Sequence, residues 1–512
     1  MVVRCSSMGL AGLESYEVMI EADIAPGLPA FDIVGLPDAA VKESRDRVRS
    51  AMRNCGFEYP VGRITVNLAP ADIKKEGPLY DLPILMALMQ LSNQLVRNID
   101  DSVFIGEISL SGKVRPVNGI LPMTIEAQKL GYKNIYVPYG NRAEAAVVKG
   151  IDVYPVDNIS QLHSHLTGIM TIEKAKAEAS VMTPEEALID FSQVKGQYEA
   201  KRAIEIAAAG SHNVLLVGPP GSGKSMLAKR VSTILPDMTF EETIETTKIH
   251  SIAGLIPSGV SLINKRPFRS PHHTISPAGL SGGGTVPRPG EISLAHNGVL
   301  FLDELPEFSR STMEVMRQPI EDGVVTISRV SGTLSYPCSV MLIGAMNPCP
   351  CGYFGHPTRK CTCSPKTVAR YLAKISGPLL DRIDIHVEVP PVQFEELSSK
   401  LPAEPSEEIR KRVNKAREIQ TERFKDLSIT CNARIPAGKL NEYCAMDDKA
   451  EQLLKKAFEK MGLSSRAYSK IVKVSRTIAD LDGSETIKSS HIAEAVQYRS
   501  LDRKYWNKEA TE

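Results

Sequence analysis

The sequence predicts an α/β protein with two successive α/β domains and an all-helical C-terminal domain. Residues 1–172 alternate strand and helix patterns, a second alternating series begins at Asp190, and only helical patterns follow Pro390-Pro391. Apolar strands separated by helices indicate a parallel sheet that is covered on both faces. We therefore expect domains at residues 1–172, 185–392 and 393–512, with the polar, alanine-rich stretch 171–180 as a linker.

Composition places the chain among ordinary globular proteins. Its 512 residues exceed what one hydrophobic core supports, and 42% hydrophobic with 24% charged residues argues against disorder. The net charge of +1 means that any basic surface must be local. No stretch approaches the roughly 18 apolar residues of a membrane span. The N-terminus has no signal pattern, so we expect a cytoplasmic protein that contacts no membrane.

The expected elements follow from apolar periodicity and turn residues. In the first domain these are strands 16–24, 64–68, 135–138 and 152–156, helices 39–55 and 122–130, and a hairpin at 104–117. In the second they are strands 213–217, 298–302, 340–346 and 383–389 with a helix at 225–235. Helices 407–424, 447–461, 465–480 and 489–499 form the C-terminal domain.

A phosphate-binding loop is the strongest motif. The stretch between an apolar strand and a helix matches G-x-x-x-x-G-K-[ST]; it consists of Gly218, Pro219, Pro220, Gly221, Ser222, Gly223, Lys224 and Ser225. Glycines let backbone N–H groups surround phosphates at a helix N-terminus. Lys224 is expected at the β/γ-phosphates and the Ser225 hydroxyl on Mg²⁺, which predicts ATP and Mg²⁺ as ligands.

Two carboxylates end the next apolar strand. Val299 to Leu302 is a buried-strand pattern, and Asp303 and Glu304 follow at its carboxyl end, where ligand sites of open α/β sheets lie. Asp303 is expected to hold Mg²⁺ together with Ser225. Glu304 is expected to orient and polarise the attacking water, because phosphoryl transfer depends mainly on positioning and charge stabilisation.

Three further polar residues are candidates for the same chemistry. Asn347 ends the strand 341–346 and is similar to the sensor-1 position of AAA+ ATPases; the alternative is a strand-capping Asn. Arg382 precedes the last core strand, from where it could reach the γ-phosphate of a neighbouring subunit, or else form a structural pair with an Asp. Arg466 opens a lid helix and resembles sensor 2. An arginine acting on a neighbour requires a closed ring.

The combined motifs resemble one family over essentially the whole chain, the Mg-chelatase-like AAA+ ATPases of the YifB/ComM type. The motifs are the P-loop, Phe268-Arg-Ser-Pro-His-His-Thr274, Gly290-Glu-Ile-Ser-Leu-Ala-His296, Asn347-Pro-Cys-Pro-Cys-Gly352 and Leu379-Leu-Asp-Arg-Ile-Asp384. The resemblance implies a hexameric ring. It also implies a DNA helicase that promotes branch migration during homologous recombination and natural transformation.

The first domain is similar to the proteolytic domain of Lon, a ribosomal-protein-S5-like fold. Gly106 to Gly119 looks like the hairpin before the catalytic lysine of Lon, and Lys75-Glu-Gly-Pro-Leu79 looks like the stretch with its serine. On this alignment Leu79 replaces the nucleophile and Leu121 replaces the lysine. No Ser–Lys dyad can form from two leucines, so we expect an inactive fold and no protease activity.

Basic stretches without acids are candidates for DNA contact. The stretch 264–290 carries Lys265, Arg266, Arg269 and Arg288; the stretch 349–380 carries five cations; and the helix from Ser465 carries Arg466, Lys470, Lys473 and Arg476. Arg329 lies near the tip of a hairpin that related ring ATPases use to grip DNA. Such cations suit sequence-independent contact with a phosphate backbone. The alternative for each is a solvated or structural surface.

Four cysteines crowd one loop, namely Cys349, Cys351, Cys361 and Cys363. Thiols stay reduced in a cytoplasmic protein, and four of them suit a tetrahedral Zn²⁺ site. The C-x-C spacing is tighter than the usual C-x₂-C, so free or redox-active thiols remain the alternative.

Together these features predict a ring-forming AAA+ ATPase that couples ATP hydrolysis to movement on single-stranded or branched DNA. A magnesium-chelatase motor subunit would use the same pocket, but the Lon-like domain and the cysteine cluster argue against it. A protein-remodelling ATPase is the third candidate.

Overall fold

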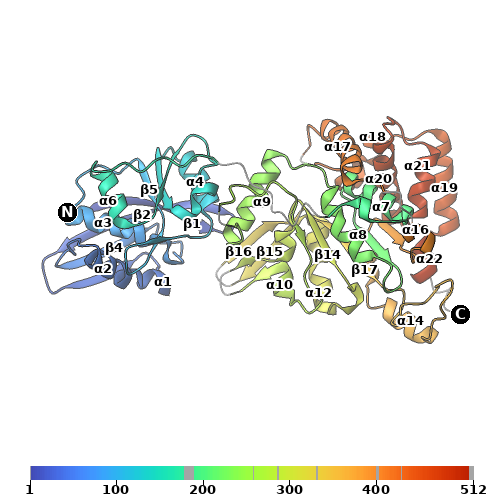
Figure 1. The fold of residues 1–512 in the computed structure, drawn as a ribbon, viewed down its shortest axis with the longest axis horizontal. Coiled ribbons are helices and arrows are strands. Elements are labelled where there is room, and N and C mark those ends of the chain that lie inside the picture. Colours follow the sequence, from blue (N-terminus) through green and yellow to red (C-terminus); the bar gives the residue numbers. More distant parts are fainter. Residues whose placement is uncertain are drawn as a thin grey trace. The chain divides into compact units, whose positions relative to one another are not determined.

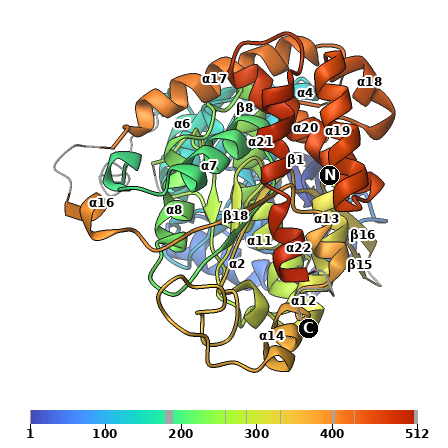
Figure 2. The same cartoon turned by 90° about the vertical axis from the view of Figure 1, so that its right-hand side faces the viewer.

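The computed structural model describes residues 2–177, 189–257, 259–284, 287–329, 332–398, 403–427 and 429–506. The chain forms two compact units (Figures 1 and 2). The first contains residues 1–181 and 240–264, and the second contains residues 182–239 and 265–512. Each unit is an α/β structure, and the second also contains a helical region, which confirms the predicted fold class.

A seven-stranded mixed sheet forms the centre of the first unit, in the order β3-β4-β2-β1-β5-β8-β9. Its strands are β1 (Val3–Ala11), β2 (Glu14–Ala25), β3 (Ala30–Val34), β4 (Arg63–Ala69), β5 (Ser102–Phe104), β8 (Asn134–Pro138) and β9 (Asp152–Val156). Helices α3 (Asp81–Leu91) and α4 (Ile120–Lys129) pack on it, and α2 (Ser44–Asn54) packs on α3 (Figure 1). The expected hairpin at 104–117 is present as β6 (Glu107–Ile108) and β7 (Val114–Arg115).

Strand β1 had no counterpart among the sequence-based expectations. It pairs with β2 on one side and β5 on the other, and Cys5, Ser6, Ser7 and Met8 are all buried. Ser7 is accommodated because its hydroxyl donates a 2.8 Å hydrogen bond to the Phe104 carbonyl oxygen. Buried serines interrupt the apolar pattern by which a central strand is recognised.

The two leucines at the Lon-like positions are core residues. Leu79 lies in the short helix η1 (Pro78–Tyr80) with 8% of its surface exposed, and Leu121 lies in α4 with none exposed. Aliphatic side chains offer neither a nucleophile nor a base. These positions therefore contribute packing to the first unit.

Helix α9 (Phe240–Ala253) belongs to the first unit, although it follows the phosphate-loop helix in sequence. It packs on α4, where the Ser251 carbonyl oxygen accepts a 3.1 Å hydrogen bond from Gly119 N–H. The Ser251 hydroxyl donates a 2.6 Å hydrogen bond to the buried carboxylate of Glu144. The stretch 185–392 expected for the second domain thus contains a segment that packs elsewhere.

Five parallel strands form the sheet of the second unit, in the order β11-β14-β17-β10-β18. They are β11 (Phe268–Arg269), β14 (Val299–Leu302), β17 (Met341–Met346), β10 (Val214–Val217) and β18 (Ile385–Glu388). Every residue of β10, β14 and β17 is buried, which explains their uninterrupted apolar sequences. Helices α7 (Tyr198–Gly210) and α8 (Lys224–Arg230) flank β10 in sequence.

The helical region follows β18 and contains the four expected helices. They are α17 (Ser406–Arg423), α19 (Asp448–Met461), α20 (Ser465–Leu481) and α21 (Ser489–Gln497), and they gather together in Figure 2. Asp447 caps α19 through a 2.7 Å bond from Ala450 N–H, and Ser464 caps α20. Gly462 ends α19 in the left-handed conformation, so the two helices are separated by a defined turn.

The basic face expected on α20 is not a free surface. Arg476 is 1% exposed and donates hydrogen bonds to the carboxylate of Asp480 (3.1 Å) and the carbonyl oxygen of Glu485 (2.6 Å). The Lys470 ammonium lies 3.1 Å from the Asp384 carboxylate with 14% of its side chain exposed. Each of these two cations neutralises an acid that is itself largely buried, so the expected exposed DNA-binding strip is wrong for Lys470 and Arg476.

We expect Asp480→Ala to destabilise the second unit strongly. Asp480 is 2% exposed and pairs with Arg476 and Arg423, so its removal leaves buried guanidinium groups without a counter-charge. The expected loss is about 3–5 kcal/mol of unfolding free energy, measured by urea denaturation.

Asp482→Ala is the matched control for that substitution. Asp482 is half exposed, and its carboxylate lies 3.3 Å from His491 and 3.7 Å from Arg202, so the loss of these solvent-screened contacts should cost less than about 1 kcal/mol. Equal losses of unfolding free energy in the two variants would show that the buried ion pairs of Asp480 contribute no more to stability than the exposed contacts of Asp482.

Candidate nucleotide site

The phosphate loop lies at the end of the central strand β10. Gly218 follows this strand and lies against the backbone of Val389. A Cβ atom added at Gly218 would lie only 2.3 Å from the Val389 carbonyl oxygen. Gly223, with φ +90°, then turns the chain into α8, whose first residue is Lys224. The loop therefore presents the N-terminus of α8, where free N–H groups and the helix dipole favour phosphate.

Lys224 is held at the centre of this loop. Its ammonium donates to the carbonyl oxygens of Gly218 (2.7 Å) and Pro219 (2.8 Å) and to Asn347 Oδ1 (3.2 Å). Burial lowers the pKa of Lys224 to about 8, although the nearby Asp303 carboxylate opposes this shift. The ammonium group is thus fixed in position by neutral oxygen acceptors, as a phosphate ligand would need to be.

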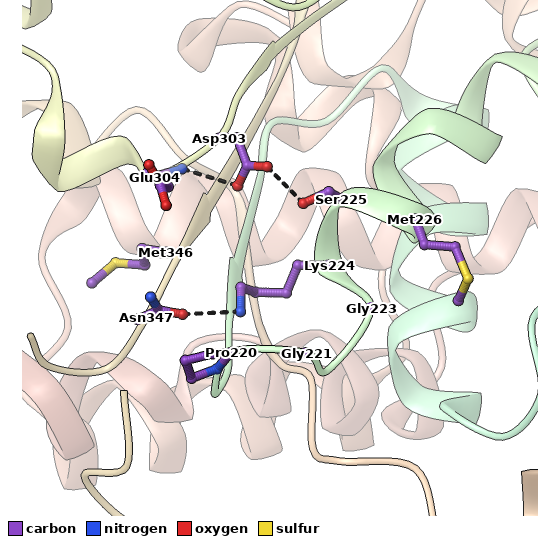
Figure 3. Close-up of a pocket in the computed structure, with 10 residues that line it drawn as sticks. All are labelled: Pro220, Gly221, Gly223, Lys224, Ser225, Met226, Asp303, Glu304, Met346 and Asn347. Atoms are coloured by element: carbon purple, nitrogen blue, oxygen red, sulfur yellow. Dashed lines mark hydrogen bonds between the residues drawn. The ribbon is translucent and has the colours of Figure 1, made fainter. Parts of the chain in front are cut away.

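The carboxylates after β14 are adjacent to the loop. The Ser225 hydroxyl donates a 2.6 Å hydrogen bond to Asp303 Oδ2, and Glu304 N–H donates a 3.0 Å bond to Asp303 Oδ1 (Figure 3). Hydroxyl and carboxylate oxygens are the ligands that Mg²⁺ prefers, so this pair fits the metal of MgATP. Glu304 has φ +52° and a 60% exposed side chain, which leaves its carboxylate accessible to water.

Asn347 completes the pocket from the neighbouring strand β17. Strands β10, β17 and β14 are consecutive in the sheet, so their carboxyl ends bring Lys224, Asn347 and Glu304 to one edge. The cavity between them has a volume of about 400 Å³, within the usual range for ligand sites. Figure 3 shows the three side chains around this cavity.

Two neighbours of the pocket were not expected from the sequence. His273 Nδ1 lies 3.7 Å from Glu304 Oε2, although His273 belongs to a stretch considered for DNA contact. The Gln197 side-chain amide donates a hydrogen bond to the Ser222 carbonyl oxygen and so braces the loop from the N-terminal side of α7. His273 belongs to the motif Phe268–Thr274, just after strand β11, but that motif predicted no role for it in the pocket; Gln197 lies in no recognised motif.

Arg382 and Arg466 are not in this pocket. Both line a second cavity of about 510 Å³, and Arg466 lies 3.6 Å from Asp381. Arg382 donates to the Pro378 carbonyl oxygen (2.7 Å) and pairs with Glu321. The structure thus groups the two arginines with each other and apart from Lys224.

Two residues that line the second cavity, Asp384 and Lys470, link the sheet to the helical region. Burial alone would raise the pKa of the Asp384 carboxyl, but Lys470 and His212 hold it well below its usual range. Asp384 also accepts a 2.9 Å hydrogen bond from Asn213 N–H, beside β10. The ion pair between Asp384 and Lys470 therefore joins the edge of the sheet to α20.

Comparison with known proteins accords with this architecture. Residues 190–397 match the family described as magnesium chelatase, subunit ChlI, and residues 20–141 and 403–499 match further parts of that subunit. The chain is 43% identical to YifB of Escherichia coli strain K12 over 494 residues, which cover 96% of each protein. It is 42% identical over 499 residues to competence protein ComM of Haemophilus influenzae, again over 96% of each.

The chain belongs to the Mg-chelatase-like YifB/ComM family. A weaker similarity links part of it to Lon protease of Mycolicibacterium smegmatis, at 24% identity over 169 residues that cover 31% of this chain and 21% of Lon. This agrees with the Lon-like fold expected for the first domain. In the part of the chain that the structure describes, no helix combines the length and the apolar character needed to cross a bilayer.

Two hairpins of this family member come together in the second unit. One is formed by β12 (Gly282–Gly283) and β13 (Arg288–Pro289), the other by β15 (Val324–Arg329) and β16 (Gly332–Pro337). The Tyr336 hydroxyl donates a 3.0 Å hydrogen bond to the Pro287 carbonyl oxygen, which joins the hairpins. The side chain of Arg329 lies outside the described part of the structure.

The remaining candidates for DNA contact differ in their surroundings. Arg269 forms two bonds of 2.6 and 2.7 Å with Glu291, and Arg266 donates to the carbonyl oxygens of Pro236 (2.7 Å) and Asn297 (2.8 Å). These contacts give both arginines a structural role. Lys265 is exposed, and so are five cations of the second basic stretch: Arg359, Lys360, Lys366, Arg370 and Lys374.

The four cysteines of the loop converge as a tetrahedral site requires. The ligand atoms of Cys349, Cys351, Cys361 and Cys363 all lie within 4.8 Å of one another. The pairwise Sγ–Sγ distances are 3.4 Å (349–351), 3.7 Å (349–361) and 3.5 Å (351–361). Ligands at the usual Zn–S distance of about 2.3 Å would be about 3.8 Å apart, so the cluster fits zinc.

We expect nucleotide affinity to fall as pH rises above about 8. Phosphate binds the charged form of Lys224, which is fully populated only below the pKa of about 8 in the empty pocket. Above that value, affinity should fall by up to about tenfold per pH unit. Titration with a fluorescent ATP analogue between pH 7.5 and 9.5 measures this.

Lys224→Arg is the control for this pH effect, because a guanidinium keeps its charge throughout the range. Its affinity should not change with pH, whatever its absolute value. The same slope in both proteins would assign the titration to another group.

Proposed function

We propose that this chain is an ATP-hydrolysing DNA motor that acts as a ring and serves branch migration or related DNA processing. The observation that carries the proposal is a pocket that gathers the phosphate loop, Asp303, Glu304 and Asn347, in a chain that is 42% identical, over 96% of its length, to a competence protein. Uptake and integration of DNA require strand exchange, which a nucleotide-driven motor can promote.

Each pocket residue has a role in hydrolysis that follows from its position. The N-terminus of α8 and Lys224 bind the β- and γ-phosphates, while Ser225 and Asp303 provide oxygen ligands for the Mg²⁺ that accompanies ATP. Glu304 accepts a hydrogen bond from the attacking water and polarises it. Asn347 orients this water and the γ-phosphate, since its side chain already contacts Lys224.

The residues of the second cavity are an argument for catalysis that is shared between neighbouring subunits. Arg382 and Arg466 share it, and both are separate from the pocket of their own chain. In a head-to-tail ring, each subunit presents one surface to the nucleotide of its neighbour. An arginine supplied in this way stabilises the charge that develops on the transferred phosphoryl group. We therefore assign both arginines to the nucleotide of the adjacent subunit.

DNA contact is assigned to exposed cations of the second unit. The five cations between 359 and 374 are exposed, and so are Lys265, on the stretch that leads to the β12–β13 hairpin, and Arg288, within β13. Their charge suits a phosphate backbone, which is bound without regard to sequence. His273 connects this same stretch to Glu304, so the position of the hairpins can affect the catalytic carboxylate.

The cysteine cluster is proposed to hold one Zn²⁺ in a structural role. Four sulfur ligands fill a tetrahedral zinc site and leave no open position for substrate. Zinc here would stabilise a loop and take no part in hydrolysis.

A motor subunit of a metal chelatase is the second candidate, because the matching family descriptions carry that name. Such a subunit would use the same pocket with protein partners. The two functions differ in what stimulates ATP turnover: DNA for one, partner subunits and a porphyrin for the other.

We expect single-stranded or forked DNA to stimulate steady-state ATP turnover severalfold. Glu304→Gln is the blank, since loss of the water-polarising carboxylate should lower turnover by about 10²–10⁴-fold while nucleotide still binds. Stimulation should fade at high salt, because the contact is electrostatic. Robust turnover that DNA does not change would reject the DNA motor in favour of the second candidate.

We expect two inactive variants, Lys224→Ala and Arg382→Ala, to restore activity when mixed. In an equal mixture, about a quarter of the interfaces in a ring pair an intact pocket with an intact arginine. Turnover should therefore recover to at most about that fraction. A mixture of Lys224→Ala with Glu304→Gln, both in one pocket, should recover less, and equal recovery would contradict the assignment of Arg382 to the neighbour.

A further inference from the structure

The cysteine cluster lies directly against the phosphate loop. The turn from Cys349 to Gly352 is closed by a 2.9 Å hydrogen bond from Gly352 N–H to the Cys349 carbonyl oxygen. Gly352 has φ +85°, and an added Cβ would lie 2.3 Å from Cδ and 2.6 Å from Cγ of Pro220. The backbone of the cysteine turn therefore packs on the proline ring of the phosphate loop.

The same turn holds a second pocket residue. Asn347, which accepts a hydrogen bond from Lys224, is separated from the buried Cys349 by a single residue. The turn thus follows Asn347 almost directly in sequence and packs against Pro220. Cys349 is therefore connected to Asn347 and to Pro220 through one short turn.

This loop has no regular secondary structure to fix its conformation. Residues 347–364 contain no helix or strand, and the next regular element is α14 (Pro365–Leu372). The two cysteine pairs are ten residues apart along the chain, and they meet at the sulfur atoms. A chain without regular hydrogen bonding depends on cross-links to hold one conformation, and metal coordination is a cross-link of this kind.

We propose that a metal ion in the cysteine cluster supports the nucleotide pocket. Zn²⁺ bound by the four sulfurs holds the turn Cys349–Gly352, and the turn holds Asn347 and Pro220 where they bind and act on ATP. Loss of the metal therefore weakens nucleotide binding and slows hydrolysis, although no metal ligand touches nucleotide. The inference rests on the zinc site and the ATPase function proposed above.

The first test removes the metal and follows zinc content, nucleotide affinity and turnover together. Cys361→Ser takes one ligand from the cluster without altering the phosphate loop. We expect zinc to fall from about one ion per chain to none, and turnover to fall by about 10²-fold, as for a catalytic group displaced by an ångström. Cys55→Ser, a thiol of the first unit, should keep zinc, affinity and turnover.

The second test changes the contact and spares the metal. Gly352→Ala keeps all four cysteines but places a methyl group against Pro220 in a left-handed conformation. We expect full zinc content with several-fold weaker binding of a fluorescent ATP analogue. Adding Pro220→Ala, which removes the opposing Cγ and Cδ, should restore part of that affinity.

The outcomes separate the proposals. A chain that neither contains nor takes up zinc overturns the metal site and this inference with it. Zinc-loaded protein whose nucleotide affinity and turnover are the same after chelation, and in Gly352→Ala, overturns the inference alone. If the intact chain binds nucleotide without turnover, the ATPase proposal fails, while the affinity measurements still decide the role of the metal.

Discussion

The parallel pairing of β10, β17 and β14 is the constraint on which the site depends. Three buried strands that run in one direction must end at one edge: Asp303 and Asn347 directly follow β14 and β17, and Lys224 follows β10 after the phosphate loop. Lys224, Asn347 and Asp303 are therefore brought together by the backbone before any side chain interacts. Their hydrogen bonds then fix a geometry that the sheet has already selected.

The pocket is surrounded by contacts from distant parts of the chain. His273 approaches Glu304 from the stretch that leads to the hairpins, Gln197 braces the phosphate loop, and Gly352 packs on Pro220. The Asp384–Lys470 ion pair ties the sheet to α20. The first three contacts each involve a single residue of the pocket or the phosphate loop, whereas the ion pair lies in the second cavity.

The division of the chain does not follow sequence order. After α8 the chain leaves the second unit and forms α9, which packs on α4 of the first unit. The chain then returns to the second unit and forms β11. The buried Glu144 carboxylate explains why α9 stays there, since Ser251 and Asn141 donate its hydrogen bonds at 2.6 and 2.7 Å. Two crossings on either side of α9 join the phosphate-loop module covalently to the Lon-like unit, in addition to the linker.

Sequence alone determined the fold class, the helical C-terminal region and the composition of the nucleotide pocket. These depend on local patterns: apolar runs that end in polar residues, a glycine loop between strand and helix, and Ser or Asp caps. Sequence alone could not identify β1, because its buried serines hide the pattern, nor reveal that α9 packs outside its own module. Only tertiary packing decided that Arg476 and Lys470 neutralise buried acids, that Arg382 and Arg466 share a cavity away from Lys224, and that His273 and Gly352 touch the pocket. Most of the deciding partners lie far away in sequence, as Asp384 does from Lys470 and Glu304 from His273. Arg476 pairs within its own helix, but its burial, which changes the free energy of a charge strongly, is set by tertiary packing.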